Sequence, residues 1–169
     1  MPEIKTSVSS KKERIKALVV EDDRNFCMIL QECLSDLEHF AIRKFFTANA
    51  SDAMQKMRSE KPDLVLLDIN LPDGNGLDLI RPMLKIHPAV GIVMVTGSAF
   101  PEDVKKGKED GAIGYILKPY NKHKIADALS KFLEYRARYY SQHFANRSQE
   151  ESSAHARAHV DFRICGEEK

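Results

Sequence analysis

The sequence contains no tryptophan and only 3 cysteines. Cys27, Cys33 and Cys165 form no C-x-x-C pair and lack the spacing of zinc ligands. An odd number of cysteines without a secretory signal favours reduced thiols in a cytosol over a framework of disulfide bonds. We therefore expect free thiols, with Cys27 and Cys33 as small residues of the core.

Long apolar runs and an excess of one charge are also missing. No stretch approaches the roughly 20 apolar residues needed to cross a bilayer. Residues 1–14 are polar and basic without the apolar segment of a signal peptide, so we expect a flexible tail there. Lysine and arginine total 26 against 25 for aspartate and glutamate, a net charge of +1. The balance favours neither nucleic acid nor an anionic membrane as partner, and we expect a soluble cytoplasmic protein.

Short apolar runs alternate with helical patterns along most of the chain. Strands are predicted at residues 15–20, 40–46, 63–67, 91–95 and 113–117, and helices at 25–37, 50–59, 76–86, 101–110 and from about 121. The first helix has apolar residues at helical spacing: Phe26, Ile29, Leu30, Cys33, Leu34 and Leu37. Three strands are nearly continuous apolar runs, typical of strands buried on both faces of a parallel sheet. The pattern predicts a doubly wound α/β domain with a five-stranded parallel sheet.

Polar side chains follow four of the predicted strands at the point where each strand ends. They are Glu21, Asp22 and Asp23 after the first strand, Asp68 after the third, Thr96 after the fourth and Lys118 after the fifth. A single acid at a strand end is commonly just a turn residue. Acids at two ends, a hydroxyl at another and a lysine at a fourth coincide by chance much less often. Because ligands of open α/β sheets bind at these carboxyl ends, the sequence predicts a functional site there.

The residue types at these strand ends suit phosphoryl transfer. Carboxylates gathered by a fold repel one another and need a counter-ion, and an all-oxygen cluster suits a hard cation such as Mg²⁺. The Asp68 carboxylate can act as a nucleophile and form an aspartyl phosphate. The metal and the Lys118 ammonium would offset charge on the phosphoryl oxygens, and the Thr96 hydroxyl can donate a hydrogen bond to the attached group.

The sequence resembles the receiver domain of bacterial two-component response regulators in four segments with the expected order and spacing. They are VVEDD at 19–23, LLDINLPDGNG at 66–76, VMVTGSA at 93–99 and GYILKPY at 114–120. The resemblance covers about residues 14–137 and implies a flavodoxin-like fold similar to that of chemotaxis regulators. It also implies a phosphorylation-gated signalling switch, not an enzyme with other substrates. A sensor histidine kinase or a histidine phosphotransfer protein would supply the phosphoryl group.

The resemblance further implies roles for individual residues. Asp68 matches the phosphoacceptor, and the implied Mg²⁺ ligands are Glu21, Asp22, Asp68 and the backbone carbonyl of Asn70. Thr96 and Lys118 match the two phosphate-binding positions, and the Lys118–Pro119 peptide bond matches one that is usually cis. Tyr115 matches an aromatic switch residue that turns inward when the Thr96 hydroxyl moves toward the phosphoryl group. Register favours Asp23 as a solvated residue or a helix cap, and Asp73 as a turn former.

The signal is expected to leave through the face formed by the fourth helix, the fifth strand and the fifth helix. This face carries Lys105, Lys106, Lys108, Tyr115, Lys122 and Lys124, and is either a solvated basic surface or a docking site for an acidic downstream protein. About thirty residues follow the receiver pattern, too few for a DNA-reading or catalytic output domain, so we expect a stand-alone receiver. The divisions are a tail at 1–14, a receiver at 15–137, and a helix extension with a polar tail at 138–169.

The last helix is predicted to extend past the receiver pattern. Its apolar positions continue through Ile125, Leu129, Phe132, Leu133, Tyr140 and Phe144. Aromatic residues beyond the domain suggest a contact with the domain itself, with a second copy or with a partner, and we favour a homodimer through this helix. The tail after Ala137 carries equal numbers of basic and acidic residues, so no direct binding of nucleic acid is expected.

Two alternatives to the receiver stay open from the sequence. An aspartate-nucleophile phosphatase of the haloacid-dehalogenase type shares the Mg²⁺ and aspartyl-phosphate chemistry but needs a D-x-D motif at its first strand. Here Asp68 follows the third strand and Asn70 replaces the second acid, which counts against a phosphatase. The other alternative is a regulator that acts through homodimerisation or through a partner of its C-terminal tail.

Overall fold

The computed structural model describes residues 15–35, 41–97 and 100–161, with side chains described as far as residue 143. The chain divides into two compact units, Met1–Phe132 and Leu133–Lys169. The strands and the first four helices lie in the first unit. In the part that is described, no helix is both long and apolar enough to span a membrane.

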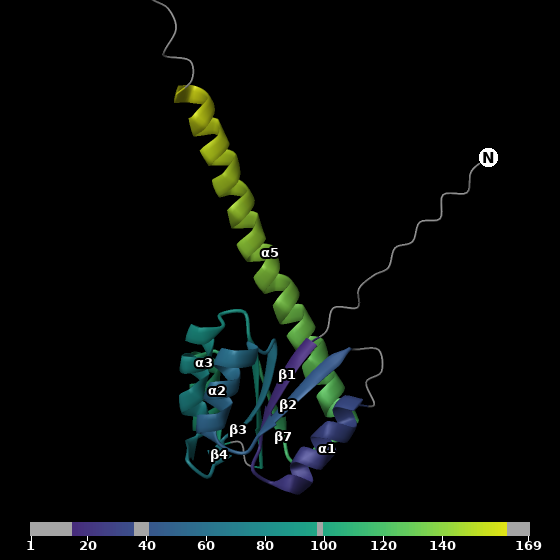
Figure 1. Ribbon diagram of the computed structural model, residues 1–169. Helices are drawn as coiled ribbons and strands as arrows, with labels where there is room; N and C mark the ends of the chain where they lie inside the picture. Colours follow the sequence, from purple (N-terminus) through teal and green to yellow (C-terminus); the bar gives the residue numbers. More distant parts are fainter. Residues whose placement is uncertain (1–14, 36–40, 98–99, 162–169) are drawn as a thin grey trace, which may run out of the picture. The chain divides into compact units, whose positions relative to one another are not determined.

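A parallel sheet of five strands forms the centre of the first unit, in the order β2-β1-β3-β6-β7 (Figure 1). These strands are β1 (Ile15–Val20), β2 (Ile42–Thr47), β3 (Leu64–Asp68), β6 (Gly91–Thr96) and β7 (Gly114–Leu117). The helices are α1 (Arg24–Ser35), α2 (Ala50–Glu60), α3 (Ile80–Ile86), α4 (Pro101–Asp110) and α5 (Lys122–Asp161). Helices α2 and α3 cover one face of the sheet and α1 covers the other (Figure 1). The predicted doubly wound α/β fold is therefore confirmed.

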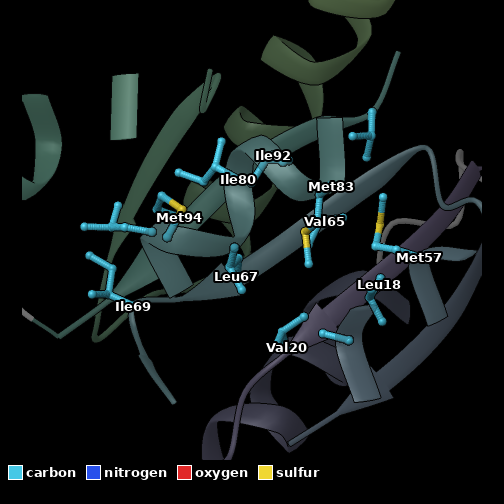
Figure 2. Packing of buried hydrophobic residues seen from close by; sticks show 13 residues of the cluster. Leu18, Val20, Met57, Val65, Leu67, Ile69, Ile80, Met83, Ile92 and Met94 are labelled. Atoms are coloured by element: carbon cyan, nitrogen blue, oxygen red, sulfur yellow. The ribbon is translucent and has the colours of Figure 1, made fainter. Parts of the chain in front are cut away.

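The central strands are buried on both faces. All residues of β3 and β6 are buried, and β1 is buried except for Lys16. One cluster joins these strands to α2 and α3 (Figure 2) and comprises Leu18, Val20, Ala53, Met57, Val65, Leu67, Ile69, Leu77, Ile80, Met83, Val90, Ile92 and Met94. Each fully buried aliphatic side chain contributes about 2 kcal/mol through removal of its surface from water. This core fixes the strands whose ends carry the polar residues.

Two features differ from the elements predicted after Asp68. The chain first forms a short antiparallel pair, β4 (Asn70–Leu71) with β5 (Gly74–Asn75). The predicted helix at 76–86 then begins as a 3-10 turn, η1 (Gly76–Leu79), and becomes α-helical only at Ile80. The Asn75 side chain accepts a hydrogen bond from the Leu77 N–H at 2.9 Å and caps this turn.

Helix α1 differs from the prediction in the face that it buries. Leu30, Cys33 and Leu34 are buried, but Ile29 is 38% exposed and Phe26 is half-buried. Ile29 precedes Leu30 by one residue and therefore lies about 100° around the helix from it, beside the buried stripe. The residues 36–40, which include Leu37 and the predicted start of the second strand, lie outside the described part.

The cysteines of α1 have different surroundings. Cys33 is buried in the core as expected, whereas Cys27 is half-buried and its thiol donates to the Glu21 carbonyl at 3.3 Å. Burial raises the pKa of the Cys27 thiol, and the negative charges of Glu21 and Asp23 raise this pKa further. Cys27 is therefore a protonated thiol, and Cys165 lies outside the described residues.

Helix α4 has the predicted bounds and few apolar residues. Pro101 occupies its first turn, and Gly111 ends it with a φ of 111°, a left-handed conformation that glycine adopts without strain. The long last helix is also confirmed, because α5 extends over 40 residues. The boundary between receiver and extension at residues 137 and 138 stays a prediction.

Candidate functional site

The predicted polar residues lie together at the carboxyl ends of four strands of the sheet. Asp68 is the last residue of β3 and pairs in register with Val95, and Thr96 is the last residue of β6 and pairs with Leu117. Glu21 follows β1 and Lys118 follows β7 directly. Glu21, Asp68 and Thr96 are 2%, 5% and 1% exposed, the only buried charged or polar residues among those described. The parallel register therefore gathers these side chains as the sequence predicted.

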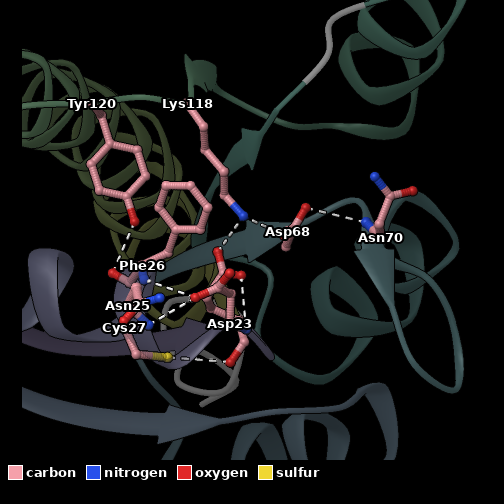
Figure 3. Close-up of polar contacts among 9 residues, drawn as sticks. Asp23, Asn25, Phe26, Cys27, Asp68, Asn70, Lys118 and Tyr120 are labelled. Atoms are coloured by element: carbon pink, nitrogen blue, oxygen red, sulfur yellow. Dashed lines mark hydrogen bonds and ion pairs between the residues drawn. The ribbon is translucent and has the colours of Figure 1, made fainter.

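Lys118 lies between the two buried carboxylates. Its Nζ atom is 2.6 Å from Asp68 Oδ2 (Figure 3) and 2.6 Å from Glu21 Oε2. Burial lowers the pKa of Lys118, but hydrogen bonds to Asp68 and Glu21 outweigh burial and leave this pKa above its usual value. Burial raises the pKa of Glu21 despite Lys118, and the Asp68 charge adds to the increase. One ammonium therefore contacts both acids, and its contact with Glu21 does not offset the effect of burial on that carboxyl group.

The acidic residues form a group that could hold a metal. Glu21, Asp22 and Asp68 each offer a carboxylate oxygen, and these oxygens lie within 4.8 Å of one another. Three carboxylates against the single charge of Lys118 leave an excess of negative charge, which a divalent cation would neutralise. Oxygen donors suit a hard cation such as Mg²⁺. Asp22 is exposed, so the group is open to solvent on its side. The residues present therefore fit the metal that the sequence suggested.

Neighbouring backbone groups orient the acids. The Asn70 N–H donates to Asp68 Oδ1 at 3.2 Å, which places the exposed Asn70 beside the predicted phosphoacceptor. The Asp23 N–H donates to Glu21 Oε1 at 3.2 Å. The Asp23 carboxylate in turn accepts from the N–H groups of Asn25 at 2.8 Å and Phe26 at 3.3 Å. Asp23 therefore caps α1, which confirms one of the two roles expected for it.

Two aromatic residues that sequence reasoning missed support Lys118. Its Nζ lies 4.3 Å from the centre of the Phe26 ring, a distance at which cation and ring attract one another. The Tyr120 hydroxyl donates to the Phe26 carbonyl at 3.0 Å, and the two rings lie 5.8 Å apart (Figure 3). Burial raises the pKa of Tyr120 and keeps its hydroxyl protonated. The Lys118–Pro119 peptide bond is cis, as the family resemblance implied.

Asp73 has a larger role than that of a turn former. Its carboxylate accepts hydrogen bonds from the N–H groups of Ala50 at 2.7 Å and Ser51 at 3.0 Å, at the first turn of α2. These hydrogen bonds hold the pKa of Asp73 below its usual value. Asp73 therefore fastens the loop after Asp68 to a helix that precedes it by more than 20 residues, a contact that no local pattern indicates.

Thr96 and Tyr115 occupy adjacent strands near the site. The Thr96 carbonyl accepts a hydrogen bond from the Lys118 N–H at 2.8 Å. Tyr115 pairs in register with Met94, two residues before Thr96, and its hydroxyl donates to the Asp103 carbonyl at 2.7 Å. Burial raises the pKa of Tyr115, and Asp103 and Asp110 add to the increase. Tyr115 thus links β7 to α4.

The fold and the polar residues at the carboxyl ends of its strands are typical of one class of signalling domain. A model of the response regulator receiver domain matches residues 17–130, and the chain belongs to this family. It is therefore a receiver domain of the two-component type, a family that acts generally as a phosphorylation-gated switch. The acidic group of Glu21, Asp22 and Asp68 fits the aspartyl-phosphate site of such domains.

Individual relatives cover most of the same region. Sporulation initiation phosphotransferase F of Bacillus subtilis is 29% identical over 118 residues, which are 70% of this chain and 93% of that protein. Chemotaxis protein CheY of Thermotoga maritima is 28% identical over 116 residues, 69% of this chain and 95% of that one. A CheY-like receiver domain from Methanospirillum hungatei has a TM-score of 0.66 at 29% identity, covering 75% and 99% of the two chains. The chain spans only 53% to 58% of several transcriptional regulators that it also matches.

Proposed function

We propose that Asp68 accepts a phosphoryl group from a sensor histidine kinase or a histidine phosphotransfer protein, and that the aspartyl phosphate gates binding of a downstream protein. The observation that carries this proposal is the ammonium of Lys118, 2.6 Å from both Asp68 and Glu21 at the carboxyl edge of the sheet. A buried carboxylate with a cation beside it and solvent on the Asp22 side is suited to attack an incoming phosphorus atom.

The transfer follows from the contacts of Asp68. One carboxylate oxygen forms a bond to phosphorus as the bond from phosphorus to the donor nitrogen or oxygen breaks, and the leaving group keeps that electron pair. The Asp68 carboxylate becomes a mixed anhydride and loses its own charge, while the phosphoryl oxygens carry the negative charge, so Lys118 can turn its charge to those oxygens. The Thr96 hydroxyl donates to one of these oxygens. Mg²⁺, held by Glu21, Asp22, Asp68 and the Asn70 carbonyl, supplies further positive charge when bound.

We propose that the downstream protein binds the face formed by α4, β7 and α5. A groove of about 290 Å³ lies between β7 and the first part of α5, and Leu117, Lys124 and Lys131 are among its lining residues. Leu117 is 46% exposed and offers apolar surface at this groove. A partner with an apolar side chain and acidic neighbours would match this groove.

Incubation with acetyl phosphate and Mg²⁺ tests the proposed phosphorylation. We expect one phosphate adduct per chain in the intact mass, which persists long enough to be isolated. The alternative of an aspartate-nucleophile phosphatase predicts rapid multiple turnover with release of free phosphate. Multiple turnover without an isolable adduct contradicts the switch.

We further propose that the second unit associates with a second copy of the chain. Within the described residues it consists of the continuation of α5, and one helix has no core of its own. The exposed Tyr140 and the half-buried Tyr139 offer aromatic surface, with their rings 6.0 Å apart. The same helix in a second copy supplies a matching aromatic surface.

Truncation of the chain after Leu133 tests this association. Light scattering is expected to give the mass of a dimer for the full chain and that of a monomer for the shortened chain. Tyr140→Ser in the full chain should shift the equilibrium toward monomer, whereas Ser141→Ala on the exposed surface should not. A full chain that is monomeric at all concentrations contradicts the proposal.

A further inference from the structure

Gly107 stands in the interior of α4, where glycine is unfavourable. It is the only buried residue of this helix. Alanine at such a position would raise the equilibrium constant for folding by about five-fold through helix propensity alone. A Cβ atom on Gly107 would overlap the Tyr115 hydroxyl and lie 2.9 Å from Cζ of that ring. The missing side chain therefore leaves a notch in α4 that the end of the Tyr115 ring fills.

Leu77 closes the other side of the notch. Its Cδ2 atom would be 3.2 Å from a Cβ on Gly107, and Leu77 itself is 1% exposed. Tyr115 packs against the buried cluster to which Leu77 belongs. The half-buried Tyr115, with its hydroxyl on the Asp103 carbonyl, thus brings β7, α4 and η1 together at one residue.

The notch is connected to Asp68 by contiguous backbone packing. Gly76 precedes Leu77 and donates its N–H to the Ile69 carbonyl at 2.7 Å. A Cβ on Gly76 would overlap the Asp68 carbonyl oxygen and lie 2.9 Å from the Asp68 carbonyl carbon. Turn η1 therefore rests directly on the backbone of the proposed phosphoacceptor. This connection reaches Tyr115 without passing through Thr96.

Two ion pairs also connect α4 to its neighbours η1 and α3. Lys106 pairs with Asp78 at 2.6 Å, and Arg81 pairs with Asp110 at 2.5 Å. In each pair at least one side chain is largely exposed, and such ion pairs contribute little to stability. Gly107 is the one residue of α4 that is buried, so the notch is where this helix packs most closely against its neighbours.

We propose that Gly107 is a positioning residue of the switch, whose missing side chain admits Tyr115 and couples α4 to the loop after Asp68 through Leu77. The packing part stands by itself, and its role in signalling rests on the proposed phosphorylation of Asp68. Any side chain at position 107 displaces the Tyr115 ring from the notch and removes the buried packing contact between α4 and η1.

A double-mutant cycle in urea tests the packing. In Tyr115→Ala, where the notch is empty, Gly107→Ala is expected to raise the folding equilibrium constant about five-fold through helix propensity. With Tyr115 present, Gly107→Ala is expected to give no gain or a loss, because the ring loses its place and its hydrogen bond. Tyr115→Phe, which lacks the hydroxyl, should give an intermediate coupling. An equal gain from Gly107→Ala in all three backgrounds overturns the proposal.

NMR with ¹³C-labelled tyrosine tests the proposed role of Gly107 in signalling. The signal of Tyr115 is the one that is missing from the spectrum of Tyr115→Phe. With acetyl phosphate and Mg²⁺, we expect this signal to shift in the original chain. In Gly107→Ala, the phosphate adduct should form to the same level while the shift is lost. Lys105→Ala, on the exposed side of α4, should keep both. If the Tyr115 signal shifts in Gly107→Ala as it does in the original chain, Gly107 has no role in signalling. If no protein forms the phosphate adduct, the proposed phosphorylation is wrong, and the double-mutant cycle in urea alone tests the packing.

Discussion

Replacement of Asp68 with asparagine is expected to abolish uptake of phosphate from acetyl phosphate while the protein stays folded. The amide has the shape of the carboxylate, so the register of β3 and β6 is unaffected, but it lacks the anionic oxygen that attacks phosphorus. Lys118 keeps its contact with Glu21 at 2.6 Å, so no cation is left unpaired in the site. Intact mass spectrometry after incubation with Mg²⁺ measures the adduct.

The matched control for this prediction is Asp127→Asn. Asp127 is an exposed acid of α5 outside the acidic group of Glu21, Asp22 and Asp68, so its replacement leaves the site intact. The control protein should form the adduct at the rate of the original chain. Phosphate uptake by Asp68→Asn at an undiminished rate shows that another residue is the phosphoacceptor.

Replacement of Lys118 with methionine is expected to lower the free energy of unfolding by about 3 kcal/mol at neutral pH. The side chains of Lys118, Glu21 and Asp68 are 9%, 1% and 6% exposed, so two buried carboxylates lose their shared cation. The estimate takes the lower end of the range for such losses because the site is open to solvent at Asp22. Urea unfolding followed by circular dichroism measures the difference, with Lys108→Met on the exposed surface as control.

The loss in Lys118→Met should depend on pH in a direction that follows from Glu21. Its pKa is raised in the folded chain, and Lys118 is a contact that lowers it, so removal of Lys118 raises this pKa further. The folded variant then binds more protons than the unfolded chain, so its stability increases as pH falls through the raised pKa toward 4.5. We expect the deficit at pH 7.5 to shrink markedly at pH 5. If the loss in free energy of unfolding is the same at both pH values, it arises from lost packing of the aliphatic part of Lys118 and not from its charge.

The sequence predicted those elements that depend on local patterns. The apolar runs of β1, β3 and β6 identified buried strands, and Pro101 and Gly111 marked both ends of α4. Parallel strands all end at one edge, so the meeting of Glu21, Asp68 and Lys118 followed from topology without side-chain detail. The family resemblance added Asn70 and Tyr115, which no periodicity would have identified.

The features that sequence reasoning missed arise from contacts between distant segments. The cap that Asp73 provides joins residues 22 and 23 apart in the chain, and Tyr120 reaches Phe26 across 94 positions. The notch at Gly107 has the same character, because glycine in a polar helix is read locally as a weak helix former. The 3-10 turn after Asn75 depends on close packing against the Asp68 backbone, which a hydrophobic pattern does not encode.

The cap that Asp73 places on α2 also gives the loop after Asp68 one anchored end. The hydrogen bonds to Ala50 and Ser51 hold the segment before β5 against the side of the domain that carries α2. If phosphorylation moves the backbone at Asp68, we therefore expect the movement to be smaller on the side of α2 than on the side of η1 and α4. Hydrogen bonds to a helix terminus, usually regarded only as a contribution to stability, thus also restrain the loop beside the proposed phosphoacceptor.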